Sequence, residues 1–428
     1  MSASTAHRSS SLVDAAPPKR HNACLSLSGP VNLPRLLYVG DVPVERSLHG
    51  SALVFRLLQG YPPGRLMVVE GNLWASKPER RLPGVAYKTF QVGWARPLYT
   101  RFSRPWTSWL VTGAKRRARF IAPLLNGFQP DGVLTVTHFC SWITAAEFAL
   151  RRNLALHIVS HDECIECANV FEAVRGPMRR AFSRVYRQAA NRFCVSPYMA
   201  EEFNQLYGIP GEVLYPSRAP EAKSFDAPPE RVGQSLGSRG LVVAFGGSLT
   251  STGVKRQLGW IASSLKARNG RLLLFGPFDP GHARASGLSS DNIVFRGMLN
   301  SEDFKRAIRE EADVLLVPMD FEARGAANAR MSFPSKLTDY TAVGLPLLIT
   351  GPEYCSAVRW ARENYPVAEL VTTEDPGAYS AALDALLDPA HRVMLGEAAL
   401  RKGDQFFSHV SAQCRFFDRL QSPCSSRN

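Results

Sequence analysis

The stretch Met331-Ser-Phe-Pro-Ser-Lys-Leu-Thr-Asp-Tyr-Thr-Ala-Val-Gly-Leu-Pro-Leu-Leu-Ile-Thr350 spells one helix-to-strand step of a parallel sheet. It begins as a loop around Pro334, and a short helix is predicted over 335–343. Gly344 ends this helix, because glycine adopts the left-handed conformation past a last turn without steric cost. The apolar run 347–349 then predicts a buried strand, so the segment indicates an open α/β sheet.

Two charged residues lie on the predicted short helix. Lys336 stands near the helix N-terminus, where a cation is unfavourable for the helix dipole unless an anion is also bound. Asp339, three residues later, could accept hydrogen bonds from a ribose. The pair therefore predicts a site for a nucleoside diphosphate; the alternative is that both charges are solvated on an ordinary surface helix.

Phe333-Pro-Ser-Lys-Leu-Thr-Asp-Tyr-Thr-Ala-Val-Gly-Leu-Pro-Leu-Leu-Ile349 resembles the donor-site segment of retaining glycosyltransferases of the GT-B fold, the glycosyl transferase group 1 or family 4-like enzymes. The resemblance implies that Lys336, Leu337 and Asp339 bind a nucleotide-sugar donor, with Asp339 at the ribose. The chain departs from the family pattern twice. Residue 339 is Asp instead of Glu, and Met331 stands where many members have a second Glu.

The composition is that of a globular protein with a strongly basic balance. The 428 residues are 45% hydrophobic and carry a formal net charge of +14, which favours an anionic partner. No apolar run reaches the roughly 18 residues of a membrane span, and the N-terminus has no apolar core of signal-peptide type. These features predict a cytoplasmic protein, with a possible peripheral position at the inner face of the cell membrane.

The order of predicted elements divides the chain into two strand–helix series. Residues 1–30 are predicted to be a disordered tail, because they are rich in Ser, Ala and basic residues and lack periodicity. A first Rossmann-like domain is predicted over 31–220, a linker over 221–238, and a second Rossmann-like domain over 239–395. Residues 396–428 are predicted as a crossover helix and tail. The helix itself is predicted over about 391–420, so it begins at the end of the second domain.

This series predicts an α/β protein with two doubly wound domains that face a cleft. The resemblance implies the GT-B architecture, in which the first domain binds the acceptor and the second binds the nucleotide-sugar. It also implies that the final helix crosses back onto the first domain.

A glycine loop opens the second domain at Phe245-Gly-Gly-Ser-Leu-Thr-Ser-Thr-Gly-Val-Lys255. Gly246 and Gly247 follow a buried strand, where glycines allow backbone amides to approach a phosphate. The spacing is neither that of a Walker A loop nor G-x-G-x-x-G. Similarity to the GT-B glycine loop implies that Lys255, with Arg256 as runner-up, contacts the donor pyrophosphate; the alternative is a plain strand-to-helix turn.

Histidines follow the predicted strands of the first domain. His161 and His138 each come at the end of a strand, the edge where open α/β sheets bind ligands. The resemblance places His161 near the donor sugar as a catalytic residue, and places His49, Gly50 and His138 on the acceptor side. An ordinary hydrogen-bonding loop histidine is the alternative in each case.

No metal or cofactor is predicted. His161, Cys164 and Cys167 could suggest zinc, but a second ligand pair is missing from the sequence, and no Asp-x-Asp cluster is present to hold a divalent ion on a diphosphate. Lys255 and Lys336 are instead predicted to stabilise the charge of the leaving diphosphate.

The resemblance thus implies a metal-independent hexosyltransferase. It would move a sugar from a UDP- or GDP-sugar to a glycan or lipid-linked acceptor, in polysaccharide or glycoconjugate synthesis, with retention. Contact with an anionic membrane is possible through basic stretches at 115–119 and 179–187, and nucleic acid is not an expected partner. The alternatives are a non-catalytic nucleotide-sugar or glycan-binding protein on the same fold, a Rossmann oxidoreductase and a sugar-nucleotide epimerase.

Overall fold

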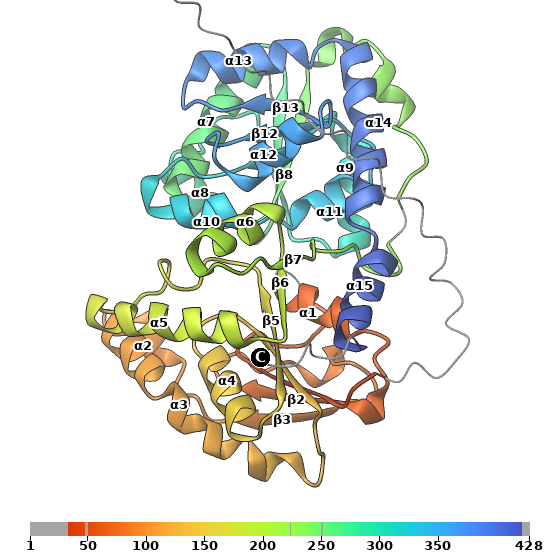
Figure 1. Cartoon of the computed structure of the whole chain (residues 1–428). Helices are drawn as coiled ribbons and strands as arrows, with labels where there is room; N and C mark the ends of the chain where they lie inside the picture. The colour runs from red at the N-terminus through yellow and green to blue at the C-terminus, as the bar shows by residue number, and fades with distance from the viewer. Residues whose placement is uncertain (1–32, 48–49, 223, 250, 422–428) are drawn as a thin grey trace, which may run out of the picture. The chain divides into compact units, whose positions relative to one another are not determined.

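The computed structural model describes residues 33–47, 50–222, 224–249 and 251–421. These residues form two parallel sheets (Figure 1). The first sheet has the order β3-β2-β1-β4-β5-β6-β7. Its strands are β1 (Leu36–Gly40), β2 (Leu66–Gly71), β3 (Ala86–Phe90), β4 (Gly132–Val136), β5 (Ala155–Ser160), β6 (Asn191–Cys194) and β7 (Glu212–Val213).

The second sheet has the order β10-β9-β8-β11-β12-β13. Its strands are β8 (Val242–Gly246), β9 (Arg271–Phe275), β10 (Ile293–Gly297), β11 (Val314–Pro318), β12 (Leu347–Thr350) and β13 (Ala368–Val371). Both sheets thus contain the 3-2-1-4-5-6 order of a doubly wound fold, in which ligands bind outside the carboxyl ends of the strands where the order reverses. This confirms the predicted fold class.

Helices cover the sheets because parallel strands are apolar on both faces. In the first half they are α1 (Gly50–Leu58), α2 (Ser103–Thr112), α3 (Ala114–Arg117), α4 (Ser141–Arg151), α5 (Glu172–Gln188) and α6 (Pro197–Tyr207). In the second half they are α7 (Thr252–Lys266), α8 (Pro280–Ala285), α9 (Ser301–Glu311), α10 (Ala326–Met331), α11 (Lys336–Tyr340), α12 (Ser356–Glu363), α13 (Pro376–Ala385), α14 (Pro389–Phe406) and α15 (His409–Gln421). In the part of the chain described, no helix is long and apolar enough to cross a membrane.

Two predicted helices differ from the structure, and one strand was not predicted. The long helix over 391–420 is two helices, α14 and α15, that separate at Phe407 and Ser408. The helix over 335–343 is shorter and ends at Tyr340, although Gly344 has the expected left-handed φ of 72°. Strand β3 was not predicted, because Phe90 is its only buried residue and the apolar pattern of a strand is therefore missing.

The C-terminal helix crosses back to the first half of the chain, as predicted. In Figure 1, α15 (blue) lies beside α1 (red to orange). Phe417 meets Tyr61 edge to face at 5.5 Å, and Phe416 lies 5.3 Å from Phe193. The predicted tail over 1–30 lies outside the described residues, and the predicted domain boundaries at 220 and 238 stay predictions.

Arg218 connects the segment between the two sheets to α11 and α14. Its buried guanidinium donates to the carbonyl oxygens of Thr338 (3.0 Å) and Thr341 (3.1 Å), at the end of α11. It also donates to the carboxylate of Asp404 on α14. These contacts satisfy carbonyls that the short helix leaves without intrahelical donors. Gly403 makes the arrangement possible, because a Cβ at that position would collide with Arg218 and Thr341.

We predict opposite effects for two helix-interior glycine substitutions. Gly403→Ala should lower the free energy of unfolding by about 1–3 kcal/mol, because Arg218 must leave its carbonyl partners. Gly259→Ala is the matched control: it lies within α7, a Cβ there meets nothing within 4 Å, and alanine should stabilise by about 0.5–1 kcal/mol. Urea unfolding of both variants measures the difference, and equal effects would contradict this role of Arg218.

Candidate functional site

The carboxyl ends of both sheets line one cavity of about 790 Å³. On the first sheet the lining residues follow β1, β2, β4, β5, β6 and β7. On the second sheet they follow β8, β9, β10 and β11, and the segment 332–339 completes the wall. This is the edge where doubly wound sheets bind ligands, and the volume is sufficient for a small-molecule substrate.

Lys336 lies on the cavity wall next to Gly247. Its ammonium lies 4.3 Å from the centre of the Phe245 ring, and it has no hydrogen-bond or ion-pair partner among the described residues. Burial lowers the pKa of Lys336 to about 8. A Cβ at Gly247 would lie 2.9 Å from Lys336 Nζ, so glycine is needed there to leave room for the ammonium. The site therefore holds a partly desolvated cation without a counter-ion.

Asp339 lies one helical turn from Lys336 and also lines the cavity. Within the described residues its carboxylate has no hydrogen-bond donor and no ion pair. Burial raises its pKa, while the charge of Arg56, on α1, opposes the shift. Arg56 itself lines the cavity and donates to the Ser217 carbonyl. Lys336 and Asp339 thus present a cation and an acceptor to the same space.

Gly246 and Gly247 leave space for neighbouring side chains, and both of their amides are hydrogen-bonded within the fold. Gly246 N–H donates to the Tyr340 hydroxyl at 2.7 Å, and Gly247 N–H donates to the Phe275 carbonyl at 2.9 Å. A Cβ at Gly246 would lie 2.6 Å from the Phe304 ring. Both predicted glycines line the cavity. Their amides are hydrogen-bonded within the fold, and their contact with a donor phosphate stays a prediction.

The N-terminus of α7, which follows this loop, is occupied by a carboxylate. Ser251 caps the helix and also donates to Asp320, and a Cβ at Gly253 would collide with the same Asp320 carboxylate. A carboxylate at this position interacts favourably with the helix dipole. The helix N-terminus is therefore satisfied internally.

Three of the predicted donor-binding residues are not brought to the cavity wall. Lys255 lies in the first turn of α7 outside the lining, and Leu337 is buried in the core. Arg256 forms an ion pair with Glu374 and stacks on Trp260 at 5.7 Å, which directs its guanidinium away from the cavity. Direct contact of Lys255, Arg256 or Leu337 with a bound donor is not supported by this geometry.

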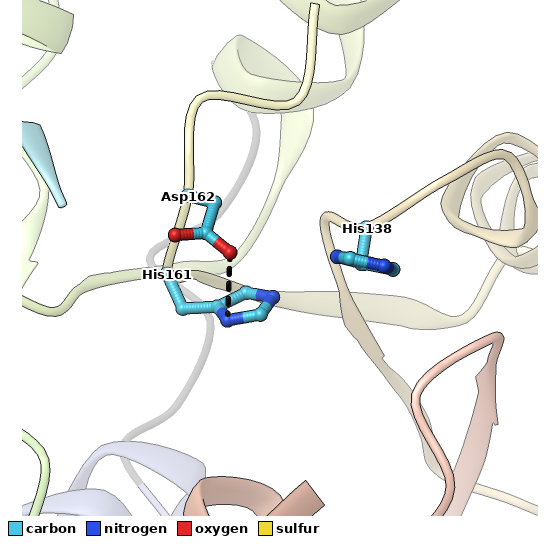
Figure 2. A group of neighbouring side chains, drawn as sticks. All are labelled: His138, His161 and Asp162. Atoms are coloured by element: carbon cyan, nitrogen blue, oxygen red, sulfur yellow. Dashed lines mark ion pairs between the residues drawn. The ribbon is translucent and has the colours of Figure 1, made fainter. Parts of the chain in front are cut away.

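On the first sheet, His161 and His138 face the cavity together (Figure 2). Their ring centres lie 5.3 Å apart, and Asp162 lies 3.5 Å from His161 Nδ1. His161 Nε2 is buried without a hydrogen-bond partner. Gly50 lines the same wall, and a Cβ there would lie 2.7 Å from His161 Cε1. The other predicted acceptor-side residue, His49, lies outside the described residues.

The protonation of His161 follows from its surroundings. Burial lowers its pKa, the adjacent Asp162 carboxylate raises it, and His138 lowers it. Because burial is the largest effect, the imidazole is neutral at pH 7, with a ring nitrogen available for a hydrogen bond to a ligand. His138, His161 and Asp162 each offer one ligand atom within 4.8 Å of the others, so they could hold a divalent cation. Cys164 and Cys167 are not part of this group.

Asp41 occupies the switch point of the first sheet, between β1 and β4. Its buried carboxylate accepts hydrogen bonds from the amides of Cys140 (3.0 Å) and Ser141 (2.6 Å), at the start of α4. Burial raises the pKa of Asp41. As at α7, an internal carboxylate fills a helix N-terminus that could otherwise bind a phosphate.

Sequence reasoning missed several cavity residues. They are Trp74, Met298 and Leu299 on loops, and Arg56 and Phe304 on α1 and α9. Their place after strand ends could have indicated the loop residues, whereas Arg56 and Phe304 lie within helices and had no such signal. Met331 is a residue at which the sequence departs from the resembling glycosyltransferase pattern. Its side chain is buried off the cavity, and its carbonyl accepts a hydrogen bond from Ser196 Oγ at 2.7 Å.

No protein-family model and no curated protein sequence matches the chain. Solved structures do match over nearly its whole length. HepE from Anabaena, solved with UDP and glucose, is 13% identical with a TM-score of 0.59, over 91% of this chain and 100% of that chain. Sucrose-phosphate synthase from Thermosynechococcus elongatus is 12% identical with a TM-score of 0.63, over 90% and 97%. An α,α-trehalose 6-phosphate synthase from Burkholderia multivorans is 14% identical with a TM-score of 0.62, over 91% and 99%.

At these identities the similarity shows the fold. The chain therefore has the GT-B fold that the segment 333–349 indicated, with its two Rossmann-like sheets on either side of the cavity.

We predict that the Lys336 ammonium makes anion binding pH-dependent. A bound diphosphate favours the protonated form, so its affinity should be level below the lowered pKa of about 8 and fall as pH rises through it, by up to about tenfold per pH unit. Calorimetric titration of UDP from about pH 7 to about pH 9.5 measures the profile. Lys336→Arg should flatten it, because the guanidinium stays charged. A flat profile for the unaltered protein would contradict the assignment.

Proposed function

We propose that this protein is a nucleotide-sugar glycosyltransferase that transfers a hexose with retention and without a metal ion. The observation that carries the proposal is the pair Lys336 and Asp339 on the cavity wall formed by the second sheet, both without a hydrogen-bond or ion-pair partner among the described residues. His161 faces the same cavity from the first sheet. These three groups fit such a donor: the ammonium fits the diphosphate, the carboxylate can accept hydrogen bonds from the ribose hydroxyls, and the neutral imidazole fits the sugar.

Lys336 is proposed to bind the diphosphate. The leaving nucleoside diphosphate gains negative charge as the glycosidic bond breaks, and a fixed, partly desolvated ammonium stabilises that charge more than water does. Among the residues that the structure describes, the cation has no counter-ion to displace, so its interaction with the ligand is not offset by loss of an ion pair there. Arg56, across the cavity, is a second cation that could approach the donor.

Asp339 is proposed to accept hydrogen bonds from the ribose hydroxyls. Aspartate is one methylene shorter than the glutamate of the resembling family, so the ribose would lie closer to α11. The apolar side chains of Met298, Leu299 and Phe304 line the same side of the cavity and suit the face of a nucleobase.

His161 is proposed to contact the transferred sugar. Its buried Nε2 has no internal partner, so a sugar hydroxyl would satisfy a group that otherwise costs free energy to bury. Gly50 keeps the ring accessible in this position. His138 and Gly50 line the cavity from the first sheet, which is the side proposed to bind the acceptor.

The structural neighbours support this reading of the cavity. HepE was solved with UDP and glucose and also with UDP-glucose, and a trehalose-6-phosphate protein from E. coli was solved with UDP-2-fluoro glucose. We propose a UDP- or GDP-sugar as donor and a glycan or lipid-linked acceptor, in polysaccharide or glycoconjugate synthesis. A cytoplasmic location with peripheral contact to an anionic membrane belongs to the same proposal.

A panel of UDP, GDP, ADP and NAD, titrated calorimetrically without added metal, tests donor binding. One nucleoside diphosphate should bind selectively, EDTA should leave its affinity unchanged, and Lys336→Ala should weaken it at least about tenfold. Arg256→Ala is the matched control, because its ion pair with Glu374 places it away from the cavity. Selective NAD binding, or a loss as large in Arg256→Ala, would overturn the assignment.

A second variant separates catalysis from binding. His161→Ala should lower the rate of donor hydrolysis or transfer by about 100-fold or more, because a sugar contact acts on the reacting part of the donor. The affinity for the nucleoside diphosphate alone should change by less than about threefold. His391→Ala is the control, since His391 pairs with Glu369 at 3.0 Å outside the cavity lining.

The same assay distinguishes a binding protein from an enzyme. Met331, in place of the expected Glu, is the observation that favours a non-catalytic nucleotide-sugar-binding protein. If the unaltered protein binds the nucleoside diphosphate yet neither hydrolyses nor transfers its sugar, the binding function stands and the transferase function falls.

A further inference from the structure

The segment between β3 and β4 exposes aromatic side chains. Trp94 is 71% exposed, Tyr99 75% and Trp109 61%, and Phe102 and Phe120 are also exposed. Large apolar side chains in water raise the free energy of the folded protein, and contiguous patches of them mark interaction sites. We call this set, Trp94, Tyr99, Phe102, Trp109 and Phe120, the aromatic surface.

The aromatic surface is organised by contacts within the fold. Trp106 stacks on Trp94 at 6.1 Å and on Trp109 at 4.8 Å, and its indole N–H donates to the Trp94 carbonyl. The rings thus form a row along α2. Gly93 packs closely under this row, since a Cβ there would lie 3.3 Å from the Trp106 ring. Ring stacking and the Trp106 hydrogen bond therefore fix the exposed positions of Trp94 and Trp109.

Cations surround the aromatic surface, and anions are absent from its sequence. No Asp or Glu occurs between Glu79 and Asp131, whereas ten Lys and Arg residues do. The exposed ones between Trp94 and Phe120 are Arg96, Arg101, Arg104, Lys115, Arg116 and Arg119. Arg101 lies over the Phe102 ring at 4.9 Å and Arg119 over the Phe120 ring at 4.7 Å. Aromatic rings and cations therefore alternate on one segment.

The aromatic surface is continuous with the cavity. The Trp74 indole N–H donates to the Tyr99 hydroxyl at 3.3 Å, and the Trp74 ring lies 6.4 Å from His138. Trp74 and His138 both line the cavity. A ligand held at the aromatic surface would thus lie near the acceptor side of the cavity.

We propose that the aromatic surface docks this protein onto an anionic lipid bilayer. Trp and Tyr rings prefer the headgroup level of a membrane, where the apolar ring and the polar N–H or O–H are both satisfied, and clustered Arg and Lys are attracted to anionic lipid. Exposed indoles and arginines are also common at protein interfaces, so vesicle binding is the measurement that separates a bilayer from an acidic protein. The lipid-linked acceptor that this docking would serve rests on the proposed function, whereas the docking itself does not.

Co-sedimentation tests the proposal with two kinds of vesicle, phosphatidylcholine alone and phosphatidylcholine with phosphatidylglycerol. The protein should bind the anionic vesicles, and binding should weaken as salt screens the cations. Trp94→Ser with Trp109→Ser should weaken binding roughly tenfold, because two rings no longer enter the headgroup layer. Tyr365→Ser, at a residue 77% exposed outside this segment, is the matched control and should bind as the unaltered protein does.

A second pair of variants measures how much the arginine charges contribute to vesicle binding. Arg116→Gln with Arg119→Gln should weaken binding to anionic vesicles by about fivefold for each arginine. Arg401→Gln with Lys402→Gln, on α14, is the control pair. Unfolding midpoints of all variants show whether the fold is kept.

Three results would overturn the proposal: no binding to anionic vesicles, equal binding to neutral vesicles, or binding that the tryptophan variants leave unchanged. Binding of a polyanion such as heparin or RNA without vesicle binding would assign the cations to another partner. Because UDP titration does not depend on the aromatic surface, failure of vesicle binding with intact UDP binding removes the docking and not the transferase. Failure of UDP binding with intact vesicle binding removes the transferase function and not the docking.

Discussion

The Arg218 guanidinium is the contact on which the site depends most. It satisfies the carbonyl end of α11, the short helix that carries Lys336 and Asp339, and it also holds α14 and the segment between the two sheets. A helix of five residues has too few internal hydrogen bonds to be stable alone, so its position must come from tertiary contacts. The position of the helix that carries both proposed donor-binding groups therefore depends on Arg218, which does not line the cavity.

Glycines and buried carboxylates shape the cavity in complementary ways. Gly247 leaves room for Lys336 and Gly50 leaves room for His161, so each functional side chain lies against a position without a Cβ. Asp41 and Asp320 meanwhile fill the N-termini of α4 and α7. Lys336 and Arg56 supply cationic side chains to the cavity, which is also lined by the first residues of α1, α9 and α11.

Much of the fold could be predicted because it is encoded locally. The alternation of predicted strands and helices indicated two Rossmann-like series, and the segment 333–349 indicated the GT-B fold. The misses have physical causes. Strand β3 exposes most of its side chains, so it lacks an apolar pattern. The break between α14 and α15 follows from the docking of α15 on α1, which a local pattern does not contain.

The sequence by itself determined the α/β class, the repeated architecture and the helix that carries Lys336 and Asp339, because strand burial, glycine stops and helix spacing are properties of neighbouring residues. The tertiary structure decided which side chains share the cavity. It placed Gly50, Arg56 and His161 around the same cavity as Lys336 and Asp339, which come much later in the chain, and it directed Arg256 to Glu374 instead. Side-chain direction depends on long-range packing, and no local pattern records it.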